Sequence, residues 1–228
     1  MIHPILFFIL LQTYFIHSTR IKTSKMEGWY SWSYAGGTFP VALRSFGVFY
    51  CPKYPDQAKW IQDGDKILIE WGSYGKYELR KTDDEAVPTF VGGPVNKPDS
   101  WRRMVYDHSF SAEEQLLSSG GSEWNFEYEK GSFPIEFRGD GLNHFVCPQF
   151  PAHAHWTLED TNKVTINWGT YGTYEMVLDA ATATMTGNKK GQPTNWRRAT
   201  FIRNLGIEGL TSLPSHEHSH KHDENCNH

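Results

Sequence analysis

Hydrophobic and polar positions alternate in short stretches along most of the chain. Residues 38–44 (TFPVALR) and 66–71 (KILIEW) show the alternation, and so do residues 132–138 (SFPIEFR) and 163–168 (KVTINW). A period of two predicts strands, because successive side chains of a strand point to opposite faces of a sheet. The pattern is typical of a protein built mainly from β-strands.

Turn signals separate these stretches at short intervals. Gly-Ser-Tyr-Gly (72–75) and Gly-Thr-Tyr-Gly (169–172) predict tight turns, while Asp-Gly-Asp-Lys (63–66) and Asp-Thr-Asn-Lys (160–163) predict hairpins. Connections this short join antiparallel neighbours. We therefore expect antiparallel meanders of about six or seven strands each. Residues 111–123 interrupt the pattern, and their Ser-x-x-Glu start predicts one short helical turn.

The same patterns occur twice, roughly 95 residues apart. The matched pairs are 38–44 with 132–138, 51–60 with 147–156, 66–79 with 163–176, and 91–106 with 186–201. This self-similarity predicts a tandem duplication. The predicted organisation is an apolar N-terminal extension or poor signal segment (1–25), a first β unit (26–110), a linker (111–123), a second β unit (124–205) and a disordered His-rich tail (206–228).

Two all-β architectures fit this organisation. In the favoured one, each unit closes into its own small antiparallel barrel; in the other, the units combine into one pseudo-twofold barrel or sandwich. The meander, the Trp-rich start at residues 26–37 (MEGWYSWSYAGG) and the Arg-bearing last strand resemble calycin-type barrels such as lipocalins. The resemblance is one of architecture and implies no function.

Composition adds two constraints. Aromatic residues make up 15% of the chain, and large rings bury much apolar area in a small core. A formal net charge of -4 gives no electrostatic footprint for nucleic acid, so no nucleic-acid partner is expected. Cys51 and Cys147 occupy matching positions, and we expect them to be buried, reduced thiols, with a disulfide between them as the alternative.

The repeated tryptophans and arginines are the candidate ligand-binding residues. For the tryptophans, packing in the core is the favoured interpretation and a platform for ligand stacking is the alternative. In each Trp-Arg-Arg, adjacent arginines point to opposite faces, so one is expected to stack on an aromatic ring and the other to face solvent or an anion. The candidates are Trp60, Trp71, Trp101, Arg102, Trp156, Trp168, Trp196 and Arg197.

No catalytic residue is predicted. Glu78 and Glu175 are the carboxylates shared by the repeats, and a salt bridge to the repeated arginines is expected for them rather than acid–base chemistry. The histidines at 108, 144, 153 and 155 each occur in one unit, so no shared nucleophile and base can be assembled. A Cys147-x5-His153-x-His155 metal site is a weaker alternative.

The termini carry two further expectations. The tail segment HEHSHKHDENCNH (216–228) predicts Zn or Ni binding, because imidazole and thiolate are natural ligands of these metals. Residues 5–16 (ILFFILLQTYFI) are short for a membrane span, so membrane association is expected only if they act as an anchor. An intracellular, cytoplasmic location is favoured, with secretion as the alternative if residues 1–25 are a signal peptide. The candidate metal ligands are His216, His218, His220, His222, Cys226 and His228.

These observations favour a non-enzymatic β-rich binding or scaffold protein. Its expected partner is another protein or an apolar small molecule. The first alternative is a barrel carrier or enzyme with an aromatic and Arg-lined small-molecule pocket. The second is a metal-handling protein acting through its tail. No cofactor is implied beyond metal on the tail.

Overall fold

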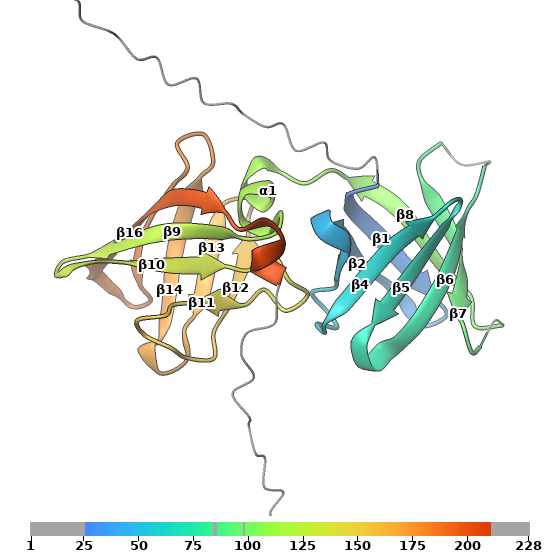
Figure 1. Ribbon diagram of the computed structural model, residues 1–228, viewed down its shortest axis with the longest axis horizontal. Coiled ribbons are helices and arrows are strands. Elements are labelled where there is room, and N and C mark those ends of the chain that lie inside the picture. Colours follow the sequence, from blue (N-terminus) through green and yellow to red (C-terminus); the bar gives the residue numbers. More distant parts are fainter. Residues whose placement is uncertain (1–25, 84–85, 98, 211–228) are drawn as a thin grey trace, which may run out of the picture.

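Two antiparallel sheets make up nearly all of the structure. The computed structural model describes residues 26–83, 86–97 and 99–210. The sheets lie side by side, each curved into a barrel (Figure 1). The chain therefore adopts the two-barrel alternative of the predicted all-β architecture. That the barrels arose by duplication stays a prediction, as do the domain boundaries.

The first sheet is a closed barrel of eight strands in chain order. Strand β1 pairs with β2 on one side and with β8 on the other, so the first barrel has no free edge. Its strands are β1 (Gly28–Tyr34), β2 (Gly37–Arg44), β3 (Val48–Tyr50), β4 (Ala58–Asp63), β5 (Lys66–Trp71), β6 (Gly75–Lys81), β7 (Thr89–Pro94) and β8 (Arg102–His108).

The second sheet also has eight strands, but its two ends meet through a weaker seam. Strands β11 and β12 are joined by a bridge between His144 and His155, flanked by a hydrogen bond from Phe145 N to Ala154 O of 2.9 Å. Its strands are β9 (Ser122–Tyr128), β10 (Gly131–Phe137), β11 (Phe145–Val146), β12 (His155–Glu159), β13 (Lys163–Asn167), β14 (Thr173–Asp179), β15 (Thr184–Lys189) and β16 (Gln192–Asn204).

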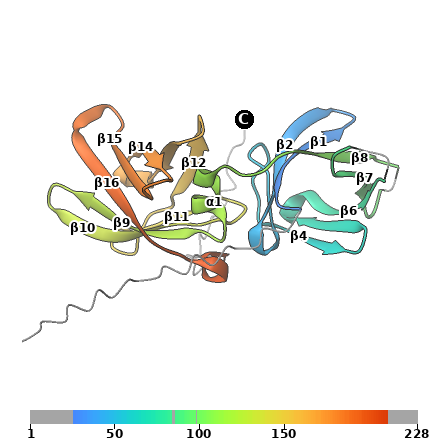
Figure 2. The ribbon, with the colours of Figure 1, turned by 90° about the horizontal axis from the view of Figure 1, so that it is seen from above.

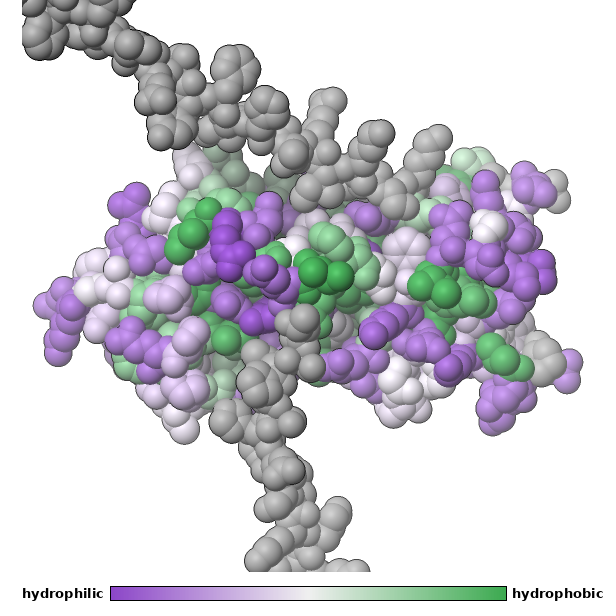
Figure 3. Space-filling model, in the orientation of Figure 1, coloured by the Kyte–Doolittle hydropathy of each residue, from purple (hydrophilic) through white to green (hydrophobic). Residues whose placement is uncertain are grey.

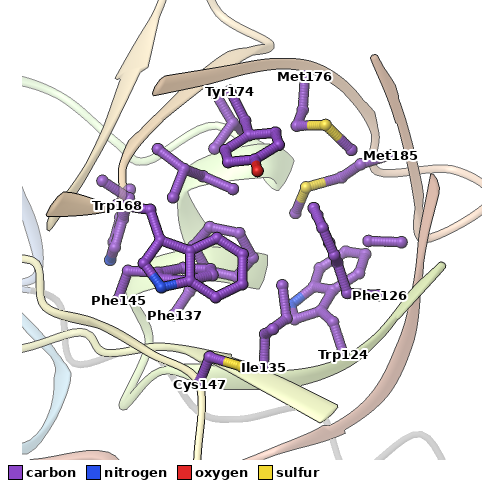
Figure 4. Packing of buried hydrophobic residues seen from close by; sticks show 14 of the residues in the cluster. Trp124, Phe126, Ile135, Phe137, Phe145, Cys147, Trp168, Tyr174, Met176 and Met185 are labelled. Carbon is purple, nitrogen blue, oxygen red and sulfur yellow. The ribbon is translucent and has the colours of Figure 1, made fainter. Parts of the chain in front are cut away.

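Alternation along the strands fills each barrel with aromatic side chains. In β1, Tyr30 and Trp32 point inward and are buried, and in β9 Trp124 and Phe126 do the same. Figure 4 shows the second core, where Trp168 lies among inward-pointing rings contributed by several strands. Burial of these large apolar side chains is the main stabilising term for each barrel.

A short helix and polar contacts occupy the junction between the barrels. Helix α1 (Ala112–Ser118) begins with the predicted capping box, in which Ser111 and Glu114 each accept a hydrogen bond from the other's backbone. It lies on the side of the second barrel that faces the first (Figure 2). Glu114 also accepts a hydrogen bond of 2.6 Å from Trp29 Nε1 of the first barrel. A 3-10 helix, η4 (Gly206–Leu210), follows β16.

Candidate functional site

The tight turn after β5 builds one wall of a small cavity in the first barrel. Trp71 ends β5, the 3-10 turn η2 (Gly72–Tyr74) follows, and β6 starts at Gly75. Gly72 and Gly75 have φ of 40° and 96°, values that favour glycine. The turn brings the Tyr74 ring to 5.3 Å from the Trp71 ring, measured between centroids.

Two hydrogen bonds hold this wall in place. Trp71 Nε1 donates to the carbonyl of Tyr54 over 3.1 Å, which anchors the connector between β3 and β4. Tyr77 Oη donates to the carbonyl of Tyr74 over 3.0 Å, which ties β6 to the turn. The two bonds fix the Trp71 and Tyr77 side chains relative to the neighbouring backbone.

The cavity that results is small and almost entirely aromatic. Its volume is about 150 Å³, a size that can hold a single six-membered ring. Every described side chain that lines it is aromatic except for one arginine. The lining residues are Trp32, Tyr34, Phe39, Tyr54, Trp71, Tyr74, Tyr77 and Arg102.

Two cations flank the aromatic rings. The Arg102 guanidinium lies 5.4 Å from the Tyr34 ring centroid and 5.8 Å from that of Tyr77. Lys53 Nζ lies 5.5 Å from the Tyr54 ring centroid. None of the residues that line this cavity is Asp or Glu. The site therefore combines apolar surface with positive charge.

The two residues that precede Arg102 hold its side chain in this position. Its Nη1 donates to the carbonyl of Trp101 over 2.8 Å and to Ser100 Oγ over 3.0 Å. The expectation that one arginine of each Trp-Arg-Arg stacks on an aromatic ring is confirmed, since Arg197 lies 5.1 Å from the ring centroid of Tyr174.

The second barrel repeats the aromatic arrangement with fewer polar groups. Trp168 contacts Tyr171 and Phe150 there, with Trp168 Nε1 donating to the carbonyl of Phe150 over 3.1 Å. Gln149 stands at the position that matches Lys53, and Phe150 at the position that matches Tyr54. The second barrel thus offers a matched comparison for the site in the first.

The other predicted tryptophans divide into two groups. Trp60 and Trp156 are buried, and their Nε1 atoms donate to the carbonyls of Arg44 and Arg138, each over 3.0 Å. Trp101 and Trp196 are 49% and 46% exposed, so the core interpretation is wrong for this pair. Strand alternation explains the exposure of Trp196 in β16, because its neighbour Arg197 turns toward the Tyr174 ring; Trp101 stands in the same relation to Arg102, just before β8 begins.

The shared cysteines and glutamates are not arranged as a reactive site. Cys51 and Cys147 are buried free thiols, as expected, and no disulfide joins them. Burial raises the pKa of both thiols, which disfavours the nucleophilic thiolate. Glu78 pairs with Lys66 over 2.8 Å and Glu175 with Lys190 over 3.2 Å. The prediction that these glutamates form salt bridges with the arginines of the Trp-Arg-Arg motif is therefore wrong.

A cluster of polar side chains at the junction was not predicted. Arg44 is buried, and its guanidinium lies 3.7 Å from the Tyr50 ring centroid. Arg44 Nη1 donates one hydrogen bond to Asn143 Oδ1 over 2.7 Å and another to the carbonyl of Asp140 over 3.0 Å. Burial lowers the pKa of Arg44 from its usual high value. Burial also lowers the pKa of His155, whose bridge partner His144 follows Asn143 in the chain.

The structure describes only some of the residues predicted to bind metal or to contact a membrane. The tail ligands at 216–228 and the apolar segment 5–16 lie outside the described residues. Within the described ranges, no three His, Cys, Asp or Glu side chains are grouped closely enough to hold a metal ion. Cys147, His153 and His155 therefore do not form the predicted three-ligand site. None of the described helices is long and apolar enough to span a membrane.

Most of the cavity was not found from the sequence. Of the lining residues, Trp71 and Arg102 are among the candidates, but Tyr34, Phe39 and Tyr54 are not. The repeated Tyr-Gly turn and the aromatic residue of Cys-Pro-x-aromatic-Pro were the available signals. Comparison with known proteins adds no relative, since no protein-family model, curated protein or solved structure matches this chain.

Proposed function

We propose that the protein is a small-molecule binding protein whose site is the aromatic cavity of the first barrel. The observation that carries the proposal is a cavity of about 150 Å³ lined by seven aromatic side chains and Arg102. Convergent aromatic surface with one fixed polar group is typical of ligand sites. A catalytic role is not part of the proposal, because the lining residues include no Asp, Glu, His or Cys.

The flanking cations define the class of ligand. Arg102 and Lys53 favour an anionic group at the edge of the cavity, and the rings favour a flat apolar body. The volume suits one ring rather than a fused polycyclic skeleton. The ligand expected is therefore a monocyclic aromatic acid, such as a carboxylate or a phosphate ester.

Titration with benzoate and phenyl phosphate, followed by tryptophan emission and by NMR, tests this proposal. We expect both anions to bind and benzyl alcohol, which lacks the charge, to bind at least about tenfold more weakly, since a charge-assisted hydrogen bond contributes about 1.5–3 kcal/mol.

The matched variants are Arg102→Gln and Arg197→Gln. The first should weaken benzoate binding at least about tenfold, and the second should leave it unchanged. Failure of both anions to bind at millimolar concentration, or equal loss in the two variants, would contradict a site in the first barrel.

A protein-binding role is the second candidate, and a groove between the barrels favours it. The groove has a volume of about 620 Å³, and its lining includes Phe46 and Ile207, which are 52% and 70% exposed. On the face shown in Figure 3, hydrophobic patches are separated by hydrophilic side chains. Proximity labelling with the full chain should identify a partner protein that neither Phe46→Asp nor Ile207→Asp binds. A partner that both variants still bind would contradict this role.

A further inference from the structure

Three histidine rings gather at the seam of the second barrel. His144 and His155 are the bridged residues that join β11 to β12, and His153 lies two positions earlier on the same segment as His155. The ring centroids of His153 and His155 are 4.6 Å apart, and those of His144 and His155 are 4.9 Å apart. Gln57 and Lys59 match His153 and His155 in the first unit, so the cluster belongs to the second barrel.

Two of the rings are held through their Nδ1 atoms. His155 Nδ1 donates to the carbonyl of Leu142 over 2.9 Å, and His144 Nδ1 donates to Asp140 Oδ2 over 2.5 Å. A neutral imidazole that donates from Nδ1 carries its lone pair on Nε2. Metal-binding histidines typically have this support, in which a carbonyl or carboxylate holds the nitrogen opposite the metal.

The nitrogens of the pair face one another. His153 Nε2 and His155 Nε2 are 3.0 Å apart. Two nitrogens that each lie 2.0–2.1 Å from one ion are separated by about 2.9–3.4 Å at the angles common for metal sites. The pair is therefore spaced as two ligands of a single ion would be.

We propose that His153 and His155 bind one divalent transition metal ion through their Nε2 atoms. Imidazole nitrogen suits Zn²⁺, Ni²⁺ and Cu²⁺. Because no group of three ligands is already assembled within the described ranges, the pair is the anchor. His144, whose ring centroid lies 4.9 Å from that of His155, becomes the third ligand when its segment shifts toward the ion with the bond to Asp140 kept. Water completes the coordination.

This position gives the ion a structural role. It would link β11 to β12 at the place where the second sheet is joined by a single bridge. His144 also follows Asn143, which accepts the hydrogen bond of Arg44 from the first barrel. Binding to the folded state alone stabilises that state, so metal should raise the midpoint of unfolding.

The experiment uses the full chain with the metal-binding residues of the tail replaced, because the tail is itself predicted to bind metal. In this background the replaced residues are His216, His218, His220, His222, Cys226 and His228. Titration with Zn²⁺ alone should then show one bound ion per chain and a higher midpoint of thermal unfolding.

Single substitutions locate the site. His153→Gln and His155→Gln should each weaken Zn²⁺ binding at least about tenfold, and both should abolish the visible absorption of bound Co²⁺. His108→Gln, on the exposed surface of the first barrel, is the control and should bind as the background does. His153 is exposed, so His153→Gln is expected to fold normally.

Two results would overturn the proposal. One is a background chain that takes up no Zn²⁺ at micromolar concentration, which would make the pair a hydrogen bond between neutral imidazoles and nothing more. The other is Zn²⁺ binding that survives unchanged in both His153→Gln and His155→Gln.

Discussion

At the scale of the residue, Trp71 connects the stability of the first barrel to its cavity. Its ring packs against Phe49 at 4.8 Å and Trp32 at 5.8 Å between centroids, deep in the core. The same ring forms part of the cavity wall. The alternation along 66–71 predicts that Trp71 is buried, but it does not show that the ring also lines a cavity.

Replacing Trp71 with alanine should lower the free energy of unfolding by about 3–5 kcal/mol, because a large ring leaves the core and a cavity remains. Denaturation in urea measures the change. Trp101→Ala, at an exposed position, is the control and should alter stability by about 0.5 kcal/mol or less. A loss below about 1 kcal/mol for Trp71→Ala would contradict its role as a core anchor.

At the scale of the element, the turn η2 has a support that its counterpart η3 (Gly169–Tyr171) lacks. Asp56 Oδ2 accepts hydrogen bonds from Ser73 N over 2.8 Å and Ser73 Oγ over 2.7 Å. Ala152 stands at the matching position of the second unit. The support fixes the turn that carries Tyr74, so it bears directly on the shape of the cavity.

Asp56→Ala should therefore speed hydrogen exchange at the amide of Ser73 and weaken benzoate binding. The amide of Thr170, in the matching turn η3, should exchange as before. Two-dimensional NMR measures both amides in one sample. Unchanged exchange at Ser73 would show that the turn does not depend on Asp56.

The same contact has a defined pH dependence. The hydrogen bonds from Ser73 hold the pKa of the Asp56 carboxyl below its ordinary value. A depressed carboxyl pKa means that the support is present at neutral pH and is lost as the pH falls through the folded-state pKa. The chemical shift of the Ser73 amide should titrate with that midpoint, and the titration should disappear in Asp56→Ala.

At the scale of the whole molecule, buried polar contacts join the two barrels. Arg44 reaches from the end of β2 to Asn143, and Asn143 Nδ2 donates to Tyr50 Oη over 3.1 Å. Ser45 Oγ is 3.0 Å from Ser119 Oγ beyond the end of α1. Directional contacts of this kind fix how the barrels sit, because each buried group needs its partner in place.

Arg44→Met should destabilise the folded chain by about 1–3 kcal/mol, because the buried Asn143 Oδ1 loses its hydrogen bond. We expect the two barrels to unfold in separate transitions in this variant, with urea denaturation followed by tryptophan emission as the measurement. Arg80→Met, at an exposed position, is the control. A single transition at the original midpoint would show that Arg44 does not couple the barrels.

The sequence predicted many of the local elements, although each sheet has eight strands where six or seven were expected. Alternation in 66–71 and 163–168 placed β5 and β13, and the Tyr-Gly turns placed the bends after them. The Ser111 capping box placed the start of α1, although the helix is longer than the expected single turn. These features depend on neighbours within a few residues, so the local pattern carries enough information to predict them.

The candidate site was predicted less completely. Trp71 and Arg102 were identified through their repetition, while Tyr34 and Tyr54 were not, since nothing local marks an aromatic ring as part of a cavity wall. The repeat predicts Trp101 to be in the core, yet it is exposed, because it precedes β8 and the neighbouring Arg102 takes the inward position at the start of that strand.

By itself, the sequence determined that the chain is all-β, where its strands and turns fall, and that the thiols of Cys51 and Cys147 are buried. Only the tertiary structure decided that the first sheet closes completely, while the ends of the second are joined through the His144–His155 bridge. It also decided that Arg44 of the first barrel donates a hydrogen bond to Asn143 of the second. The physical reason is the range of the interactions. Side-chain periodicity acts along one strand, whereas barrel closure, cavities and contacts between barrels depend on residues that lie far apart in the chain.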